Sequence, residues 1–178
     1  MTAKMPRPIT ADTVMRMATG YLAQRAASTA HLRKVLEARL RRRLVRDDTG
    51  PEAGFDMAPL LDDVLARLVR AGLLDDQAYA ASRARSLAAK GLPAWRVARD
   101  LADKGIETEQ DDILGALEPE AQARRYAERK RLGPHRRSPR PEDHEKDLRS
   151  LVRAGFSPRV ARRALTDEEP ESPDMNEQ

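Results

Sequence analysis

The feature that most constrains this chain is a recurring set of helix ends. Apolar residues recur at helical spacing through most of the sequence, and several of these stretches stop at a glycine. The glycines that end them are Gly72, Gly91, Gly105 and Gly155. Glycine readily adopts the left-handed backbone conformation that closes an α-helix. Because almost everything between the two ends of the chain follows this pattern, we expect an all-α fold.

The helical stretches group into three sets of three. The best evidence is a pair of similar junctions, KGIETEQDDILGAL at 104–117 and AGFSPRVARRAL at 154–165. Each has a helix-ending glycine, an apolar residue, a capping Thr or Ser, and a short helix that ends in Ala-Leu. We therefore expect tandem three-helix modules, none of which buries its apolar face alone. The expected boundaries are a flexible N-terminus at 1–10, module 1 at 11–74 with a loop at 45–58, module 2 at 75–117, module 3 at 118–165 with a loop at 133–141, and an acidic disordered tail at 166–178.

The pentapeptide LVRAG occurs twice, at 68–72 and at 151–155. The first copy ends the third helix of module 1, and the second ends the middle helix of module 3. The two copies therefore do not mark the same position in the repeat. We interpret them as the same device for ending a helix, used at two places.

The stretch RAGLLDDQAYA (70–80) is interpreted as the boundary between modules 1 and 2. Gly72 ends one helix, and Leu73 and Leu74 are expected to pack between the modules. Asp75 or Asp76 caps the next helix, and Tyr79 starts its core. Other expected N-caps are Thr10, Ser28, Thr108 and Ser157, and prolines 59, 93 and 158 are expected at helix starts.

Composition favours small stacked helices over one large core. Of the 178 residues, 40% are hydrophobic but only 3% are aromatic, so the core consists of Leu, Val, Ile and Ala. The chain has no cysteine, which excludes disulfides and thiolate metal sites. No apolar run approaches the ~18 residues that span a bilayer, and MTAKMPRPIT lacks the apolar region of a signal peptide. We expect a cytoplasmic protein.

Charge is distributed in alternating blocks. Residues 1–46 carry a net charge of +9, residues 82–105 carry +4 and residues 121–165 carry +9, whereas residues 47–81, 106–120 and 166–178 each carry −6. On a helical chain this alternation places basic elements at repeated positions. Repeated basic elements favour a polyanionic partner, or an assembly that contains one.

Catalytic or metal-binding roles are not supported by the sequence. Four acidic pairs occur, at 47–48, 62–63, 75–76 and 111–112. Neighbouring residues on a helix point about 100° apart, so such a pair does not converge on one ion, and most lie in a loop or near a helix start. The histidines at 31, 135 and 144 have no ligand spacing, and no phosphate-binding loop is present. We expect no enzyme activity, cofactor or metal.

Trp95 is expected to be partly buried between helices. The chain has only six aromatic residues, which make no platform for base stacking.

Three segments together resemble one family. They are YLAQRAASTAHLRKVL (21–36), LLDDVLARLVRAGLLDDQAYA (60–80) and KGLPAWRVARDLADKGI (90–106), and their order, with the two glycine junctions, is similar to the RecX family of regulators of the bacterial recombinase RecA. The resemblance covers about residues 14–165. It implies an elongated, curved array of three three-helix modules with a basic face. It further implies a non-enzymatic protein that binds RecA filaments on DNA and mainly inhibits recombination, ATP hydrolysis and co-protease activity in DNA repair and the SOS response.

The basic residues on the polar helix faces are the predicted site. The predicted RecA- and DNA-facing residues are Arg33, Lys34, Arg41, Arg42, Arg43, Arg83, Arg85, Lys90, Arg96, Arg99, Arg124, Arg125, Arg129 and Lys130. The longer loops at 45–58 and 133–141 depart from the family pattern, so contacts there are not transferred. Two alternatives stay open: a helix-turn-helix-like protein that binds DNA without RecA, and a structural adaptor for an acidic protein. We expect a monomer.

Overall fold

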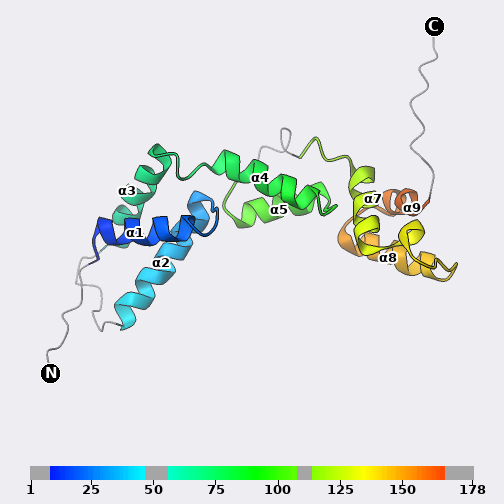
Figure 1. The fold of residues 1–178 in the computed structure, drawn as a ribbon, viewed down its shortest axis with the longest axis horizontal. Helices are drawn as coiled ribbons and strands as arrows, with labels where there is room; N and C mark the ends of the chain where they lie inside the picture. Colours follow the sequence, from blue (N-terminus) through cyan, green and yellow to red (C-terminus); the bar gives the residue numbers. More distant parts are fainter. Residues whose placement is uncertain (1–8, 47–55, 108–113, 167–178) are drawn as a thin grey trace, which may run out of the picture. The chain divides into compact units, whose positions relative to one another are not determined.

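The computed structural model describes residues 9–46, 56–107 and 114–166. Within these ranges the chain forms eight α-helices, one short 3₁₀ helix and no strand, which confirms the all-α prediction (Figure 1). The helices are α1 (Ala11–Leu22), α2 (Thr29–Arg46), α3 (Met57–Arg70), α4 (Asp76–Ala88), α5 (Ala94–Asp103), α7 (Pro119–Lys130), η1 (Gly133–His135), α8 (Asp143–Ala154) and α9 (Pro158–Leu165). The predictions for 1–8, most of the 45–58 loop, the helix start at Thr108 and the tail from 167 lie outside the described residues.

The chain divides into two compact units. Unit 1 comprises Met1–Ala80 and Asp103–Glu107, and unit 2 comprises Ala81–Ala102 and Thr108–Gln178. Helix α4 therefore starts in unit 1 and continues in unit 2, and α5 ends in unit 1. The order of the helices is consistent with three modules. However, module 2 is shared between the two units instead of forming a compact unit of its own.

Module 1 is a bundle in which α1, α2 and α3 pack against one another (Figure 1). Its apolar side chains with 0% exposure are Val14, Ala18, Leu32, Leu36, Leu40, Leu61 and Val64. They recur at helical spacing, as the sequence pattern predicts. The Thr10 hydroxyl accepts a hydrogen bond from the Thr13 amide, which confirms Thr10 as the N-cap of α1.

The loop between α2 and α3 is shorter than predicted. Helix α2 continues through Arg46, and α3 begins at Met57, where Asp56 accepts a hydrogen bond from the Ala58 amide and caps the helix. Pro59 therefore lies at the third helical position and not at the first. This position tolerates proline because the first turn of a helix leaves its amides without carbonyl partners.

The module boundary at 70–80 differs from the prediction at Leu73. Gly72 has a φ of 68° and ends α3, as expected. Leu74 is buried, but Leu73 is 55% exposed, so only one of the two leucines packs inward. Asp75 caps α4 by accepting a hydrogen bond from the Ala78 amide at 2.8 Å. Asp76 does not cap α4; its carboxylate accepts hydrogen bonds from Thr29 of α2.

The start of α2 is thus held by residues far away in sequence. The Thr29 amide donates to Asp76 Oδ1 at 2.7 Å. Ser28 caps α2 by accepting from the His31 amide, and its hydroxyl donates to the carbonyl of Lys104 at 2.6 Å. Within unit 1, these bonds attach the first turn of α2 to the beginning of α4 and to the residues after α5.

Module 3 has its own core, formed where α9 packs against both α7 and α8. Buried apolar residues include Ala123, Ala127, Leu151, Ala161 and Leu165. Ser157 caps α9 by accepting from the Val160 amide, and Pro158 occupies the first helical position, as predicted. The rings of Tyr126 and Phe156 pack edge to face with their centroids 6.0 Å apart.

Two glycines join the helices within unit 2. A Cβ added to Gly91, which follows α4, would lie 2.8 Å from the Gln122 carbonyl oxygen and would overlap the α7 backbone at Tyr126. Gly155, at the end of α8, packs against the indole of Trp95, whose Nε1 donates to the Gly155 carbonyl at 3.1 Å. These close approaches place α4 and α5 directly against module 3.

Candidate functional site

The predicted basic residues of module 1 all lie on α2, but they differ in environment. Arg33 is partly exposed and forms an ion pair with Asp62 of α3. Lys34, Arg41 and Arg42 are exposed, and Arg41 Nη2 lies 3.8 Å from Glu37 one turn earlier. Arg43 is only partly exposed.

The predicted residues on α4, on α5 and in the turn between them divide in the same way. Arg83 forms two hydrogen bonds with Asp100, from Nε at 2.7 Å and from Nη2 at 2.8 Å. This bidentate ion pair ties α4 to α5, so its role is structural. The exposed residues are Arg85, Lys90, Arg96 and Arg99.

On α7, three of the four predicted residues are exposed. Arg125, Arg129 and Lys130 reach solvent, whereas Arg124 is partly exposed. The Arg129 guanidinium lies 5.9 Å from the centroid of the Tyr126 ring, at a distance where a cation–π attraction contributes about 0.5–1 kcal/mol. On α7, the positive charge of Arg129 therefore lies next to the aromatic ring of Tyr126.

Exposed basic residues on α9 were missed by the prediction. Arg159, Arg162 and Arg163 lie on its outer face, while Val160 and Ala161 are buried. Arg163 Nη1 donates to Glu120 Oε1 of α7 at 2.7 Å, and this hydrogen bond lowers the pKa of Glu120. The helical spacing of the α9 arginines in RRAL and PRVA was a signal that could have identified them.

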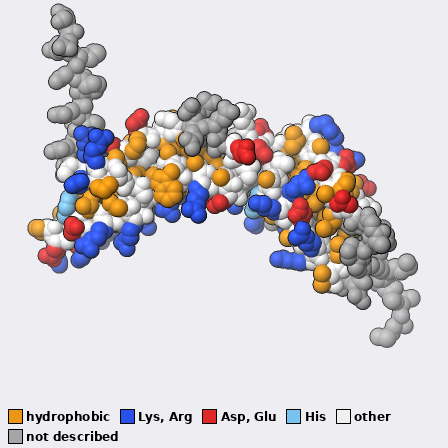
Figure 2. All heavy atoms as spheres, turned by 180° about the vertical axis from the view of Figure 1, so that it is seen from behind, with side chains coloured by type: hydrophobic (Ala, Val, Ile, Leu, Met, Phe, Trp, Pro, Cys, Tyr) orange, Lys and Arg blue, Asp and Glu red, His pale blue; other side chains and the backbone are white. Residues whose placement is uncertain are grey.

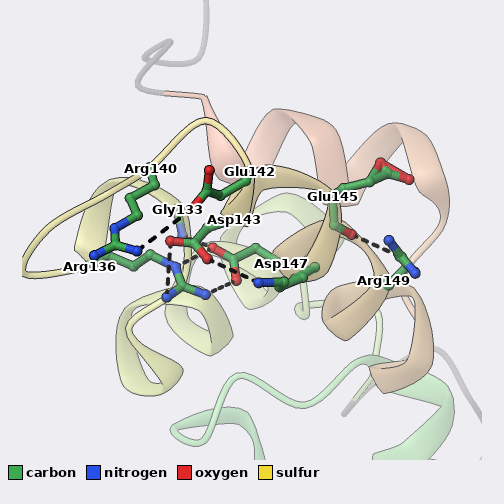
Figure 3. Close-up of polar contacts among 9 residues, drawn as sticks. Gly133, Arg136, Arg140, Glu142, Asp143, Glu145, Asp147 and Arg149 are labelled. Atoms are coloured by element: carbon green, nitrogen blue, oxygen red, sulfur yellow. Dashed lines mark hydrogen bonds and ion pairs between the residues drawn. The ribbon is translucent and has the colours of Figure 1, made fainter.

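The loop after α7 is anchored by a buried carboxylate. Asp147 of α8 is 2% exposed and accepts hydrogen bonds from Arg136 Nη2 at 2.6 Å, Arg136 Nε at 2.8 Å and the Gly133 amide at 2.7 Å (Figure 3). The hydrogen bonds from Arg136 hold the pKa of Asp147 below its usual range, although burial opposes them. The same bonds raise the pKa of Arg136. Arg136, in the longer loop of module 3, thus stabilises the fold.

His31 was considered as a metal ligand and has another role in the structure. Its Nε2 lies 3.1 Å from the hydroxyl of Tyr21 in α1. Burial lowers its pKa, and the positive charges of Lys104, Lys34 and Arg25 lower it further. A neutral His31 therefore joins α1 to α2 through a hydrogen bond.

Among residues 9–46, 56–107 and 114–166, no group of three His, Asp or Glu side chains is arranged to hold a metal ion. In the same part of the chain, no helix is both long enough and apolar enough to cross a membrane. Most of the predicted site residues are exposed cations on helix surfaces. Such a surface binds anions or acidic macromolecules.

On the face drawn in Figure 2, neither unit by itself presents one continuous basic surface. There, Lys and Arg side chains gather in several small clusters separated by hydrophobic and acidic side chains. This arrangement differs from the deep, uniformly basic groove that tracks a nucleic-acid backbone. It is typical of surfaces in which apolar and charged contacts alternate.

Comparison with known proteins identifies the family. A family described as RecX, second three-helix domain, matches residues 75–110. The chain is 36% identical over 169 residues to the regulatory protein RecX of Myxococcus xanthus (strain DK1622), covering 91% of this chain and 89% of that protein. It also superposes on a crystal structure of regulatory protein RecX with a TM-score of 0.58 and 24% identity, covering 89% of this chain and 72% of that one. The similarity to the Myxococcus protein extends over nearly the whole length of both chains, and the chain therefore belongs to the RecX family.

Proposed function

We propose that this protein binds the nucleoprotein filament of RecA and restrains its strand exchange, ATP hydrolysis and co-protease activity during DNA repair and the SOS response. The observation that carries the proposal is the 36% identity to a regulatory protein RecX over 91% of the chain. An all-helical chain with exposed cations on successive helices suits a partner whose acidic sites repeat.

The proposed contact surface is smaller than the sequence prediction. It consists of the ten predicted residues that are exposed: Lys34, Arg41, Arg42, Arg85, Lys90, Arg96, Arg99, Arg125, Arg129 and Lys130. Arg33 and Arg83 are omitted because their charges are satisfied by Asp62 and Asp100. We further propose that the protein acts as a monomer in the cytoplasm and that it touches DNA within the filament.

The test is the ATPase rate of RecA on single-stranded DNA, titrated with this protein at two salt concentrations. Replacing Lys34, Arg41 and Arg42 together by Glu reverses three exposed charges on α2. Because attraction then becomes repulsion, we expect the concentration for half-inhibition to rise about tenfold or more, equivalent to at least about 1.4 kcal/mol. The native chain should lose potency as salt rises.

A matched control reverses three exposed arginines outside the predicted surface, by replacing Arg137, Arg149 and Arg153 with Glu. The net charge changes by the same amount, so a nonspecific charge effect would weaken both triple variants equally. Equal weakening of both variants would show that α2 is not part of the proposed surface. Full inhibition of the RecA ATPase by the α2 variant would show the same. Circular dichroism at 222 nm checks that both variants stay helical.

The alternative of DNA binding without RecA is separated by a second measurement. Fluorescence anisotropy of labelled single- and double-stranded DNA gives the affinity of the isolated protein. A RecA-independent DNA-binding protein would bind tightly, with log K falling steeply as log salt rises. Weak binding to naked DNA together with strong inhibition of the ATPase would support a filament regulator.

A further inference from the structure

The two copies of LVRAG end their helices with the same backbone geometry. In α3, the Gly72 amide donates to the Val69 carbonyl and the Leu73 amide donates to the Leu68 carbonyl, both at 2.9 Å. In α8, the equivalent bonds run from Gly155 to Val152 at 2.9 Å and from Phe156 to Leu151 at 3.2 Å. Both glycines have positive φ, and both patterns form a Schellman motif. The five identical residues therefore form the same backbone turn twice.

The copy in α8 is a binding site for an indole. Trp95 Nε1 donates to the Gly155 carbonyl at 3.1 Å, and a Cβ on Gly155 would lie 2.6 Å from Trp95 Cε2. Only the absence of a side chain lets the ring approach this closely. The helix end thus supplies both a backbone acceptor for the indole N–H and space for the ring.

The copy in α3 presents the same features to solvent. No described residue lies within 4 Å of the position that a Cβ would take on Gly72. Around this glycine, Val69 is 49% exposed and Leu73 is 55% exposed, whereas Phe156, which replaces Leu73 in the other copy, is 4% exposed. Two large, exposed apolar side chains therefore flank a glycine whose Cβ position is open.

We infer that residues 69–73 form a docking site for a tryptophan side chain of a protein partner. The occupied copy in α8 shows which chemistry fits this helix end: a flat apolar ring that donates one hydrogen bond to the glycine carbonyl. Arg70, exposed at the rim, favours acidic residues beside that tryptophan. A second copy of this chain fits less well, because its single tryptophan is already bound to its own Gly155.

Aromatic anchors that enter small apolar sites account for much of the affinity of protein interfaces. The site would therefore add a specific contact to the salt-sensitive attraction of the basic residues. The inference does not rest on the proposed function, because it concerns a different surface and can be tested without a filament.

The test uses N-acetyl-L-tryptophanamide as the probe and the full chain labelled with nitrogen-15. Titration to millimolar concentrations should shift the amide signals of Gly72 and Leu73 in a saturable manner, while N-acetyl-L-leucinamide produces smaller shifts. Replacing Val69 and Leu73 together by Ser should weaken probe binding about tenfold, since it removes both apolar borders. Because both side chains are exposed, the double variant is expected to fold. The single substitution Val69→Lys is a second variant, which removes one of the two apolar borders.

Val152→Ser is the matched control, because Val152 occupies the same motif position in α8 and is 41% exposed. This variant should bind the probe as the native chain does. The inference is overturned if the probe shifts neither Gly72 nor Leu73, or if the double variant binds equally well. Sedimentation equilibrium supplies a last check. If the native chain forms a dimer and the double variant with Val69→Ser and Leu73→Ser is a monomer, the site is occupied by a second copy of this chain. That result would overturn the assignment to another protein.

Discussion

Replacing Asp147 by Asn tests how the fold of module 3 is held together. The substitution keeps the shape of the side chain and removes its charge. Asp147 accepts three hydrogen bonds, two from Arg136 at 2.6 and 2.8 Å and one from the Gly133 amide at 2.7 Å. The carboxylate is 2% exposed, so water cannot replace these partners.

The expected loss is about 2–3 kcal/mol. Removing one partner of a buried ion pair costs about 3–5 kcal/mol, because the other charge stays buried without compensation. Here the Arg136 side chain is 29% exposed, so water solvates part of the guanidinium once the carboxylate is gone. The remaining amide oxygen can still accept one hydrogen bond. Both effects reduce the loss below the full value for a buried pair.

Urea denaturation followed by tryptophan fluorescence measures this loss. Trp95 is the single tryptophan and lies in unit 2 with Asp147, so its emission reports on the unit that the substitution affects. Asp143→Asn is the control, because its carboxylate lies 3.6 Å from Arg136 Nη1 and is 15% exposed. That weaker pair should contribute less than about 1 kcal/mol. Equal losses for the two substitutions would refute the assigned importance of Asp147.

The pH dependence provides an independent check. Because hydrogen bonds from Arg136 lower the pKa of Asp147, its contribution is present above the pKa of the unfolded chain, about 3.9, and is lost as pH falls through the folded pKa. The stability difference between the native chain and Asp147→Asn should be constant from pH 7 to about 5 and should vanish in strong acid. A difference that persists unchanged at pH 2 would contradict the electrostatic explanation.

Two further predictions concern helix ends. Gly72→Ala should lower the free energy of unfolding by about 1–2 kcal/mol, because of the positive φ alone. Gly155→Ala should lower it by about 1–3 kcal/mol more, because its Cβ would overlap the Trp95 ring. Equal losses for the two substitutions in thermal denaturation would contradict this. Asp76→Ala should cost about 1 kcal/mol and accelerate hydrogen exchange of the Thr29 amide, and an unchanged Thr29 rate would show that the hydrogen bond is unimportant.

Helix ends could be predicted from the sequence because their causes are local. Thr10 and Ser157 cap helices through amides three residues away, and Gly72 ends α3 by its own backbone freedom. The predicted loop limits at 45 and 58 were wrong for a related reason, since α2 continues through Arg46 and α3 begins at Met57. Helical residues flank that loop on both sides, and composition alone does not show where the last hydrogen-bonded turn stops.

Contacts between distant segments could not be predicted in this way. Asp75 and Asp76 are chemically identical neighbours, yet one caps its own helix and the other binds Thr29, 47 positions away. Likewise, Gly72 and Gly155 stand in identical pentapeptides, and only the position of α5 brings Trp95 to the second. Which role each residue takes depends on the packing of helices, and no local pattern encodes it.

The same reasoning explains why the proposed contact surface leaves out some of the predicted basic residues. Arg33 and Arg83 occupy polar faces of amphipathic helices, as do the exposed arginines, so their sequence signal is the same. Each is neutralised by an acid on a neighbouring helix, Asp62 and Asp100 respectively. The net charge of a sequence segment does not reveal such pairs, because the two partners belong to different helices. The proposed filament contact therefore involves fewer cations than the charge blocks suggest. Substituting Arg83 would therefore affect stability before it affects binding.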